Sequence, residues 1–216
     1  MFFLMFTACM NSVSSEISGP MLAIGDSFLD YNLDQDASIP DFTGKALQVS
    51  IQNNAIGGTR ISSGNPEDDI PSQYESGDWS WVLMDGGGND LNEECGCNSC
   101  EENMDGMISA DGQTGDIVSL IQDVIEEGAQ VAWIGYYEIP AEADEFFNCN
   151  DELAVLSQRF SVLADQQDAF IFIDSRSVLS YDSHPQAYSE DLVHPSTEGS
   201  RIIGEYVAAQ ILAVSE

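Results

Sequence analysis

The chain has 216 residues, 43% of them hydrophobic, which is enough for one ordinary globular domain with a substantial core. It carries 38 acidic residues against five Lys and Arg, a formal net charge of -33. Such a surplus of negative charge repels the phosphates of nucleic acids and the anionic face of a bilayer, which argues against nucleic-acid binding. It also disfavours anionic ligands relative to neutral ones, and it is typical of a heavily hydrated surface suited to a salty habitat.

The sequence opens with an apolar run, residues 1–8, that ends immediately before Cys9. The run is far too short to span a membrane and resembles the end of a bacterial lipoprotein signal, although no Lys or Arg precedes it. Cys9 is then the candidate lipidation site and lipid anchor, and export to the periplasm or cell surface is expected. We predict that residues 1–20 are a signal remnant and tether and that residues 21–216 form one domain. A plain apolar terminus is the alternative.

Five short apolar runs, each partly β-branched or aromatic, predict buried β-strands. They cover residues 21–24, 48–51, 81–84, 131–134 and 170–173. Two stretches between them, residues 117–126 and 153–164, place apolar residues on one helical face and predict crossover helices. Such alternation predicts the α/β class, as a three-layer α/β/α sandwich around a mainly parallel five-stranded sheet.

Two further segments, residues 62–80 and 92–114, are rich in Gly, Asp, Glu and Ser and predict long loops. The active site of an open α/β sheet lies at the carboxyl ends of its strands, so these loops are candidates for substrate binding.

The first predicted strand is followed by Gly25-Asp-Ser27, which predicts a turn into a helix. A serine here can stand at the carboxyl edge of the sheet with its amide directed toward a substrate oxygen, so Ser27 is a candidate nucleophile. A helix N-cap is the alternative role. The Gly-x-Ser-x-Gly elbow of the α/β-hydrolases is missing, because Leu29 stands where its second glycine is needed.

Glycine-rich turns follow the second and third predicted strands. Gly57 and Gly58 follow the second strand and can supply a turn with positive φ. Gly86-Gly-Gly-Asn89-Asp90 follows the third strand, where the Asn89 amide could donate to an oxyanion. Each segment alone is equally consistent with a plain turn, but their occurrence together and in order indicates a site.

The sequence contains only two histidines, and spacing distinguishes them. Asp191 precedes His194 by three residues, a spacing that places the carboxylate beneath the imidazole Nδ1 and fixes the tautomer. His184 has Tyr181 at that position, and its nearest acid, Asp182, is only two residues back. We therefore favour His194 as the base and interpret His184 as a loop residue.

The remaining four cysteines are Cys95, Cys97, Cys100 and Cys149. An even number in an exported chain predicts two disulfides, with three connectivities open. If Cys95 and Cys97 are too close to pair, Cys149 bonds to one of them and Cys100 to the other, which would tie a lid beside the site. A zinc knot is the alternative, but paired Cys-x-x-Cys spacing and a nearby His are missing, and we expect no metal.

Taken together, four segments resemble the signature blocks of the SGNH hydrolases, the GDSL-like lipases and esterases. They are Gly25-Asp-Ser27-Phe28, Gly57-Gly58, Gly88-Asn89-Asp90 and Asp191-x-x-His194-Pro195, and they lie within residues 21–199. The resemblance implies the flavodoxin-like SGNH fold.

The same resemblance implies a Ser27-His194-Asp191 triad, in which the serine is the nucleophile. It also implies three oxyanion donors: the Ser27 amide, Gly58 and Asn89. Gly57 competes with Gly58, because the family has one key glycine and this turn offers two. Phe28 replaces the common leucine and is expected to pack under the turn.

The implied reaction is hydrolysis of a carboxylic ester through an acyl-enzyme on Ser27, without a cofactor. We expect neutral short-chain acyl or acetyl esters of small molecules or carbohydrates, because the chain is acidic and shows no long apolar insertion for a fatty chain. Thioesterase or lysophospholipase activity in the same family is one alternative. A non-catalytic surface-binding lipoprotein on the same scaffold is the other.

Overall fold

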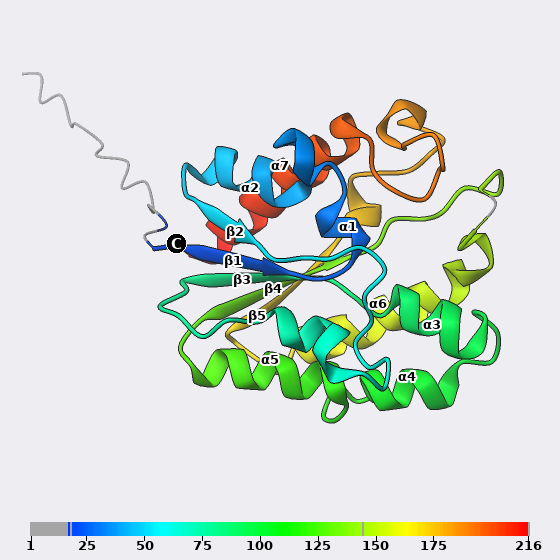
Figure 1. Ribbon diagram of the computed structural model, residues 1–216, viewed down its shortest axis with the longest axis horizontal. Coiled ribbons are helices and arrows are strands. Elements are labelled where there is room, and N and C mark those ends of the chain that lie inside the picture. Colours follow the sequence, from blue (N-terminus) through cyan, green and yellow to red (C-terminus); the bar gives the residue numbers. More distant parts are fainter. Residues whose placement is uncertain (1–16, 18, 144, 216) are drawn as a thin grey trace, which may run out of the picture.

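The computed structural model describes residues 17, 19–143 and 145–215, and a parallel sheet lies at its centre (Figure 1). The strands are β1 (Met21–Ile24), β2 (Ile51–Asn53), β3 (Trp81–Met84), β4 (Gln130–Gly135) and β5 (Phe170–Asp174). They lie in the order β2-β1-β3-β4-β5, and every neighbouring pair is parallel. All strands therefore end at the same edge of the sheet. Cys9 and most of the predicted tether lie outside the described residues.

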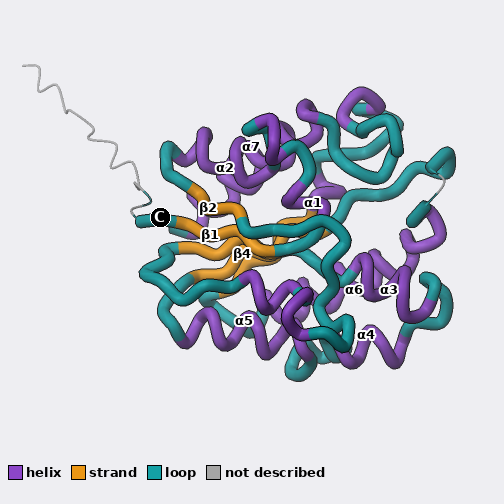
Figure 2. Tube along the Cα trace, in the orientation of Figure 1, coloured by secondary structure: helices purple, strands orange, loops and turns teal. Residues whose placement is uncertain are grey.

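Helices cover both faces of this sheet, as Figures 1 and 2 show. One layer contains α1 (Ser27–Asp30), α2 (Ile39–Leu47) and α7 (Thr197–Val214). The other contains α3 (Gly88–Cys95), α4 (Glu101–Met107), α5 (Asp116–Glu126) and α6 (Asn150–Ala164). The predicted three-layer α/β/α sandwich with a five-stranded parallel sheet is confirmed.

The inner strands β1 and β3 are apolar and buried at every position, and β4 is so after its exposed first residue, Gln130, because both faces of these strands are covered. In β1, Leu22 and Ile24 belong to the core shared with α5 and α6, whereas Met21 and Ala23 belong to the core shared with α2 and α7. All four side chains are fully buried. A strand packed on both sides shows a continuous apolar run without polar alternation, which is the pattern seen in the sequence.

The two crossover helices predicted from periodicity are present. α5 and α6 bury the apolar stripe expected for them: Ile117, Leu120, Ile121 and Val124, and Leu153, Leu156, Phe160 and Leu163. Burial of such a stripe, worth about 1.5–3 kcal/mol for each large side chain, fixes these helices on the sheet.

Two predictions about local structure are wrong. The second strand runs over Ile51–Asn53 and not over residues 48–51, because Gln48 closes α2 in a left-handed conformation, with its amide donating to Gly44 O. Residues 92–114 are not a long loop, since they contain the end of α3 and all of α4. Their Met104 and Met107 side chains are buried, so a few apolar residues in a polar segment suffice to seat a helix.

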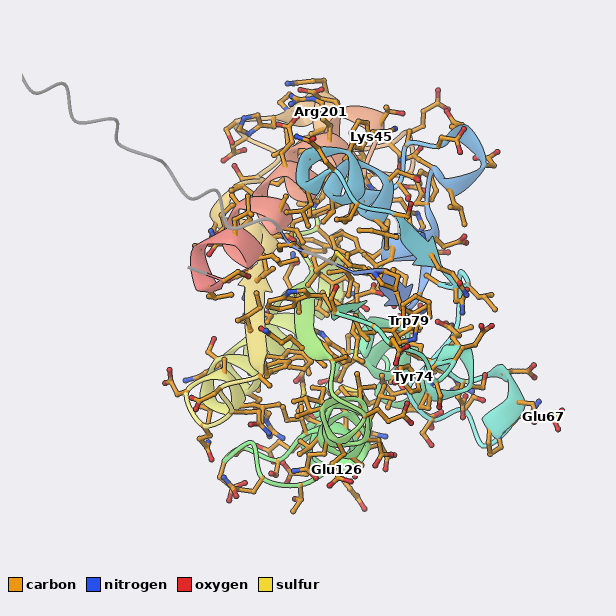
Figure 3. All side chains as sticks on the ribbon, turned by 90° about the vertical axis from the view of Figure 1, so that its left-hand side faces the viewer. Lys45, Glu67, Tyr74, Trp79, Glu126 and Arg201 are labelled. Carbon is orange, nitrogen blue, oxygen red and sulfur yellow. A yellow bond between two sulfur atoms is a disulfide. The ribbon has the colours of Figure 1, made fainter. Side chains whose placement is uncertain are left out.

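Of the five Lys and Arg residues, Lys45 and Arg201 lie on α2 and α7 (Figure 3), whereas Arg159 on α6 is buried. Each arginine pairs with an acid: Arg60 with Glu94, Arg159 with Asp105, Arg176 with Asp174, and Arg201 with Glu198 and Glu205. Within the described part of the chain, no helix has both the length and the apolar character needed to cross a membrane.

Candidate active site

Ser27 stands at the carboxyl edge of the sheet as the first residue of α1. The chain leaves β1 at Ile24 and turns through Gly25 and Asp26. Asp26 caps the helix, because its Oδ1 accepts a hydrogen bond from the Phe28 amide at 2.9 Å. The N-cap role considered for Ser27 therefore falls to its neighbour, and the serine hydroxyl is directed to His194.

His194 contacts Ser27 across 167 residues of sequence. Its Nε2 lies 2.8 Å from Ser27 Oγ, and its Nδ1 lies 2.8 Å from Asp191 Oδ2. The turn between Asp191 and His194 passes through Leu192 in the left-handed region (φ 61°), and Asp191 Oδ1 accepts the Val193 and His194 amides at 2.8 and 2.9 Å. The three side chains form one hydrogen-bonded line.

The carboxylate at the end of this line is held ionised. Partial burial raises the pKa of Asp191, but hydrogen bonds from the His194 amide, the Ser189 hydroxyl, the His194 ring and the Val193 amide outweigh it and lower the pKa to about 2. A carboxylate in this state remains charged near neutral pH, where it stabilises an imidazolium beside it.

The His194 ring is also held from one face. Tyr31, directly after α1, stacks on it with ring centroids 4.5 Å apart and an interplanar angle of 4°. This contact restricts rotation of the imidazole away from Ser27. The second histidine, His184, lies in the loop before α7, where its Nδ1 is 2.8 Å from Ser183 Oγ.

The Gly57-Gly58 turn lies against α1. Its Thr59 amide donates to Ile56 O at 3.3 Å, and Gly58 takes a φ of 80°, which favours glycine. The Gly57 amide donates to Asp30 Oδ2 at 3.0 Å, whereas the Gly58 amide has no acceptor among the described residues. A Cβ on Gly57 would lie 3.5 Å from Ser27 Cβ, so the turn flanks the serine.

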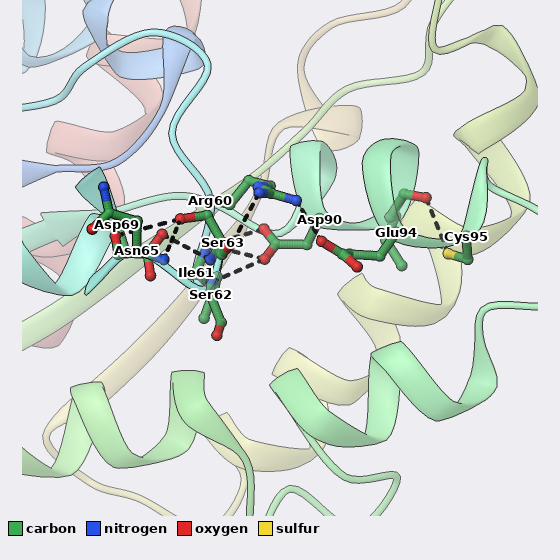
Figure 4. Close-up of polar contacts among 10 residues, drawn as sticks. Arg60, Ile61, Ser62, Ser63, Asn65, Asp69, Asp90, Glu94 and Cys95 are labelled. Carbon is green, nitrogen blue, oxygen red and sulfur yellow. Dashed lines mark hydrogen bonds and ion pairs between the residues drawn. The ribbon is translucent and has the colours of Figure 1, made fainter. Parts of the chain in front are cut away.

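Asn89 is the second residue of α3, and its amide points back across the edge of the sheet. Nδ2 donates to Thr59 O at 2.9 Å and lies 3.4 Å from Asp26 Oδ2. The next residue, Asp90, accepts the Ile61 and Ser62 amides at 3.0–3.1 Å, which Figure 4 shows. Asp90 thereby fastens the chain beyond the glycine turn to the helix that carries Asn89.

A small pocket opens beside these groups. Ser27, Asn89 and His194 line it together with mainly apolar side chains: Phe28, Tyr136, Tyr137, Ile139, Phe146, Leu153 and Val193. Its cavity volume is about 40 Å³. Of the described residues that line it, none is Lys or Arg.

Several groups that the sequence did not indicate hold Gly25 and Asp26, the two residues before Ser27. Gln73 clamps Gly25, accepting its amide at 2.7 Å and donating to its carbonyl at 2.9 Å. Tyr136 Oη donates to Asp26 Oδ2 at 2.6 Å, and the Asp26 amide donates to Asp85 Oδ1 at 2.9 Å. One of these groups could have been found from the sequence, because Asp85 is an acidic residue directly after a buried strand.

All four remaining cysteines pair, as Cys95–Cys100 and Cys97–Cys149. This is one of the two arrangements expected, with Cα separations of 5.5 and 4.8 Å that suit a disulfide. The first bridge closes the loop after α3, and the second ties that loop to the start of α6. In the described part of the chain no group of three His, Cys, Asp or Glu residues is arranged to hold a metal ion.

A parallel α/β/α fold with Asp, His and Ser side chains in one hydrogen-bonded line at its carboxyl edge has the arrangement of a serine hydrolase. The chain belongs to the GDSL-like lipase/acylhydrolase family, whose model matches residues 23–202. The family and its structural relatives are hydrolases, several of them esterases. No curated protein matches the chain significantly.

Solved structures of low identity share the fold. A carbohydrate acetylesterase from Sinorhizobium meliloti is 16% identical, with a TM-score of 0.67 over 91% of this chain and 99% of that one. A catalytic mutant of an acetylxylan esterase from Geobacillus stearothermophilus is 15% identical, with a TM-score of 0.63 over 91% and 96%. A putative SGNH hydrolase from Slackia heliotrinireducens is 21% identical, with a TM-score of 0.61 over 89% and 98%.

Replacement of Cys97 and Cys149 by Ser should lower the free energy of unfolding by about 4 kcal/mol, because this bridge spans 52 residues. The matched double substitution of Cys95 and Cys100, whose bridge spans only 5, should cost about 2 kcal/mol. Urea unfolding followed by circular dichroism measures both losses. Equal losses, or four free thiols in peptide maps of the unreduced protein, would contradict this pairing.

Proposed function

We propose that this protein is a serine esterase that hydrolyses carboxylic esters of neutral, short-chain acyl or acetyl groups. The observation that carries the proposal is the hydrogen-bonded line from Asp191 through His194 to Ser27, at the mouth of a small apolar pocket. A binding module on the same scaffold would have no need of this line.

In the proposed reaction the Ser27 hydroxyl attacks the ester carbonyl while His194 Nε2 takes its proton. The imidazolium, stabilised by ionised Asp191, then protonates the departing alcohol, which leaves an acyl group on the serine oxygen. A water molecule loses a proton to His194 and attacks this acyl-enzyme. The carboxylic acid is released and the proton returns to Ser27.

The tetrahedral intermediates carry a negative oxygen that needs donors. We assign these donors to the Ser27 amide, the Gly58 amide and Asn89 Nδ2, which would exchange its long 3.4 Å contact with Asp26 Oδ2 for the oxyanion. Gly58 is preferred to Gly57 because the Gly57 amide is already bonded to Asp30. Each such donor supplies about 2.7–4 kcal/mol of barrier reduction in comparable enzymes.

The size and charge of the pocket support the substrate class. A cavity of about 150 Å³ admits benzene, so the 40 Å³ beside Ser27 suits an acyl group of a few atoms and disfavours the fatty chain of a lysophospholipid. The net charge of -33 disfavours anionic esters. Two structural relatives act on acetylated carbohydrate according to their names, which favours a carbohydrate alcohol here.

We also propose that the protein works outside the cytoplasm. The two disulfides support this placement, since such bridges persist in oxidising compartments. Attachment through a lipid on Cys9 is part of the same proposal. Mass spectrometry of the protein purified from its natural membrane fraction would identify a diacylated N-terminal cysteine, and an intact unmodified terminus there would refute it.

Ser27→Ala and His194→Ala should each lower kcat for p-nitrophenyl acetate by at least about a thousandfold, and the double variant should lose no more, because the triad acts as a unit. The matched control is His184→Ala, which removes the other histidine and should stay within about twofold of the parent. An equal loss of kcat in the two histidine variants would show that the assignment of His194 as the base is wrong. Hydrolysis unaffected by loss of Ser27 would refute the esterase proposal.

Chain-length preference tests the pocket. We expect kcat/KM for p-nitrophenyl esters to fall at least about tenfold from acetate to octanoate, because a methylene without space costs about 1–3 kcal/mol. Leu153→Ala, which removes part of the pocket wall, should raise kcat/KM for the octanoate ester relative to that for the acetate ester. Val155→Ala, on the exposed side of α6, is the control and should leave the ratio unchanged. An octanoate preference in the parent protein would argue for a lipase.

The acid limb of the pH profile should report one group. Asp191, with a pKa of about 2, stays ionised throughout, whereas His194 must be neutral to accept the serine proton. We expect kcat/KM to rise from acid to neutral pH, because a protonated imidazole cannot accept the serine proton. A profile flat from about pH 5 to 8 would exclude a histidine base of this kind.

A further inference from the structure

Two carboxyl groups lie buried side by side beneath Ser27. Asp26 follows β1 and is 2% exposed, and Asp85 follows β3 and is completely buried. The two strands are neighbours in register, so their ends are level. A Cβ on Gly25 would lie only 1.6 Å from Asp85 Oδ1, which shows how closely the Asp85 carboxyl approaches the backbone of β1.

The surroundings of this pair contain negative charge and uncharged hydrogen-bonding groups. Asp30 on α1 adds a further carboxylate, Tyr136 directly after β4 contributes a phenol, and Gln73 contributes an amide. Among the described residues, no Lys, Arg or His donates a hydrogen bond to either buried carboxyl. Two buried carboxylates without a basic partner cannot both be ionised without a large cost in free energy.

The Asp85 carboxyl has one oxygen that accepts and one without a donor. Oδ1 accepts the Asp26 amide at 2.9 Å, while no donor in the described chain reaches the buried Oδ2. Burial raises the pKa of Asp85 well above its ordinary range, and the Asp26 carboxylate, by its charge and by a hydrogen bond between the two side chains, raises it further. The Asp26 amide opposes this shift and Asp30 adds to it.

Asp26 accepts hydrogen bonds from several residues of the site, and a negative charge on Asp85 would disturb them. Its Oδ1 accepts the Phe28 amide at 2.9 Å, which fixes the first turn of α1 and with it Ser27. Its Oδ2 accepts Tyr136 Oη at 2.6 Å and lies 3.4 Å from Asn89 Nδ2. One carboxylate therefore orients both the proposed nucleophile and a proposed oxyanion donor.

We propose that Asp85 remains a neutral carboxylic acid at the pH of catalysis and donates its proton to Asp26, as a positioning residue for Ser27 and Asn89. The pair then carries a single negative charge, and the hydrogen bond between the two side chains has a donor. The positioning role rests on the proposed esterase function. The protonation of Asp85 does not.

The decisive variant is Asp85→Asn, whose amide keeps the shape of the acid, donates where its hydroxyl donates and accepts where its carbonyl accepts. Infrared difference spectra between the parent protein and D85N at pH 7 should show loss of one protonated-carboxyl C=O band. The matched control is Asp111→Asn on the surface, where hydrogen bonds from Ser109 and Gln113 lower the pKa and the acid is already ionised. D111N should remove only carboxylate bands. No protonated band lost in D85N would overturn the proposal.

Stability gives a second readout that needs no turnover. Folding raises the pKa of Asp85, so the protonated side chain contributes to the stability of the folded protein. This contribution is complete at pH values below the pKa that Asp85 has in the unfolded chain, and it declines as pH rises toward the pKa in the folded protein. Between about pH 5 and 7 the folding equilibrium constant of the parent protein should therefore fall relative to that of D85N, by up to about tenfold per pH unit. Parallel curves for the two proteins would contradict a proton retained only in the folded state.

Kinetics then test the positioning role. D85N should keep kcat for p-nitrophenyl acetate within about twofold. Asp85→Ala leaves the Asp26 amide without its acceptor and removes the proposed donor to the Asp26 carboxylate, so it should lower kcat about ten- to hundredfold with a smaller change in KM. A D85N protein as inactive as D85A would contradict the proposal that an amide can replace a protonated Asp85. If the infrared and stability results hold while Ser27→Ala stays active, the esterase proposal fails and the protonated Asp85 stands.

Discussion

The in-register pairing of β1 with β3 is the constraint on which the site depends. Ile24 lies opposite Met84, so the chain leaves both strands at the same level, and Gly25 meets Asp85 directly. Ser27 lies three residues after Ile24, where β1 ends, and Asn89 lies five residues after Met84, where β3 ends. A glycine is required at position 25 because any Cβ there would overlap the Asp85 carboxyl. The distance between the serine and the asparagine is thus set by backbone hydrogen bonds of the sheet.

Acidic side chains near this junction accept hydrogen bonds mainly from uncharged groups. The four arginines pair with acids, and none of the described residues that line the pocket is Lys or Arg. The site is instead held by backbone amides, hydroxyls and amide side chains that donate to Asp26, Asp85, Asp90 and Asp191. Carboxylates serve here as acceptors that bring loops together, which is compatible with a chain that has few cations to spare for ion pairs.

Rigidity at the site comes from several directions at once. The sheet positions Ser27 and Asn89, the Asp191 turn and the Tyr31 ring hold His194, and the Cys97–Cys149 bridge fastens the segment that begins α6 to the loop after α3. Because proton transfer and acyl transfer are sensitive to sub-ångström placement, such support from neighbouring groups is what an acyl-transfer site requires.

The sequence by itself determined the class of fold, the sheet edge and the candidate Ser27, Asn89, Asp191 and His194, because apolar runs and short motifs are local patterns that survive without a structure. It misplaced β2 by up to three residues, because Gln48 closes α2 in a left-handed conformation that its residue type does not signal. It missed α4, since a helix seated by two methionines depends on packing partners distant in sequence. The disulfide pairing, the engagement of Gly57 by Asp30 and the contact between Asp26 and Asp85 were decided only by the tertiary structure. Each joins residues that no local spacing relates, and only the order of parallel strands brings them within hydrogen-bonding or bonding distance.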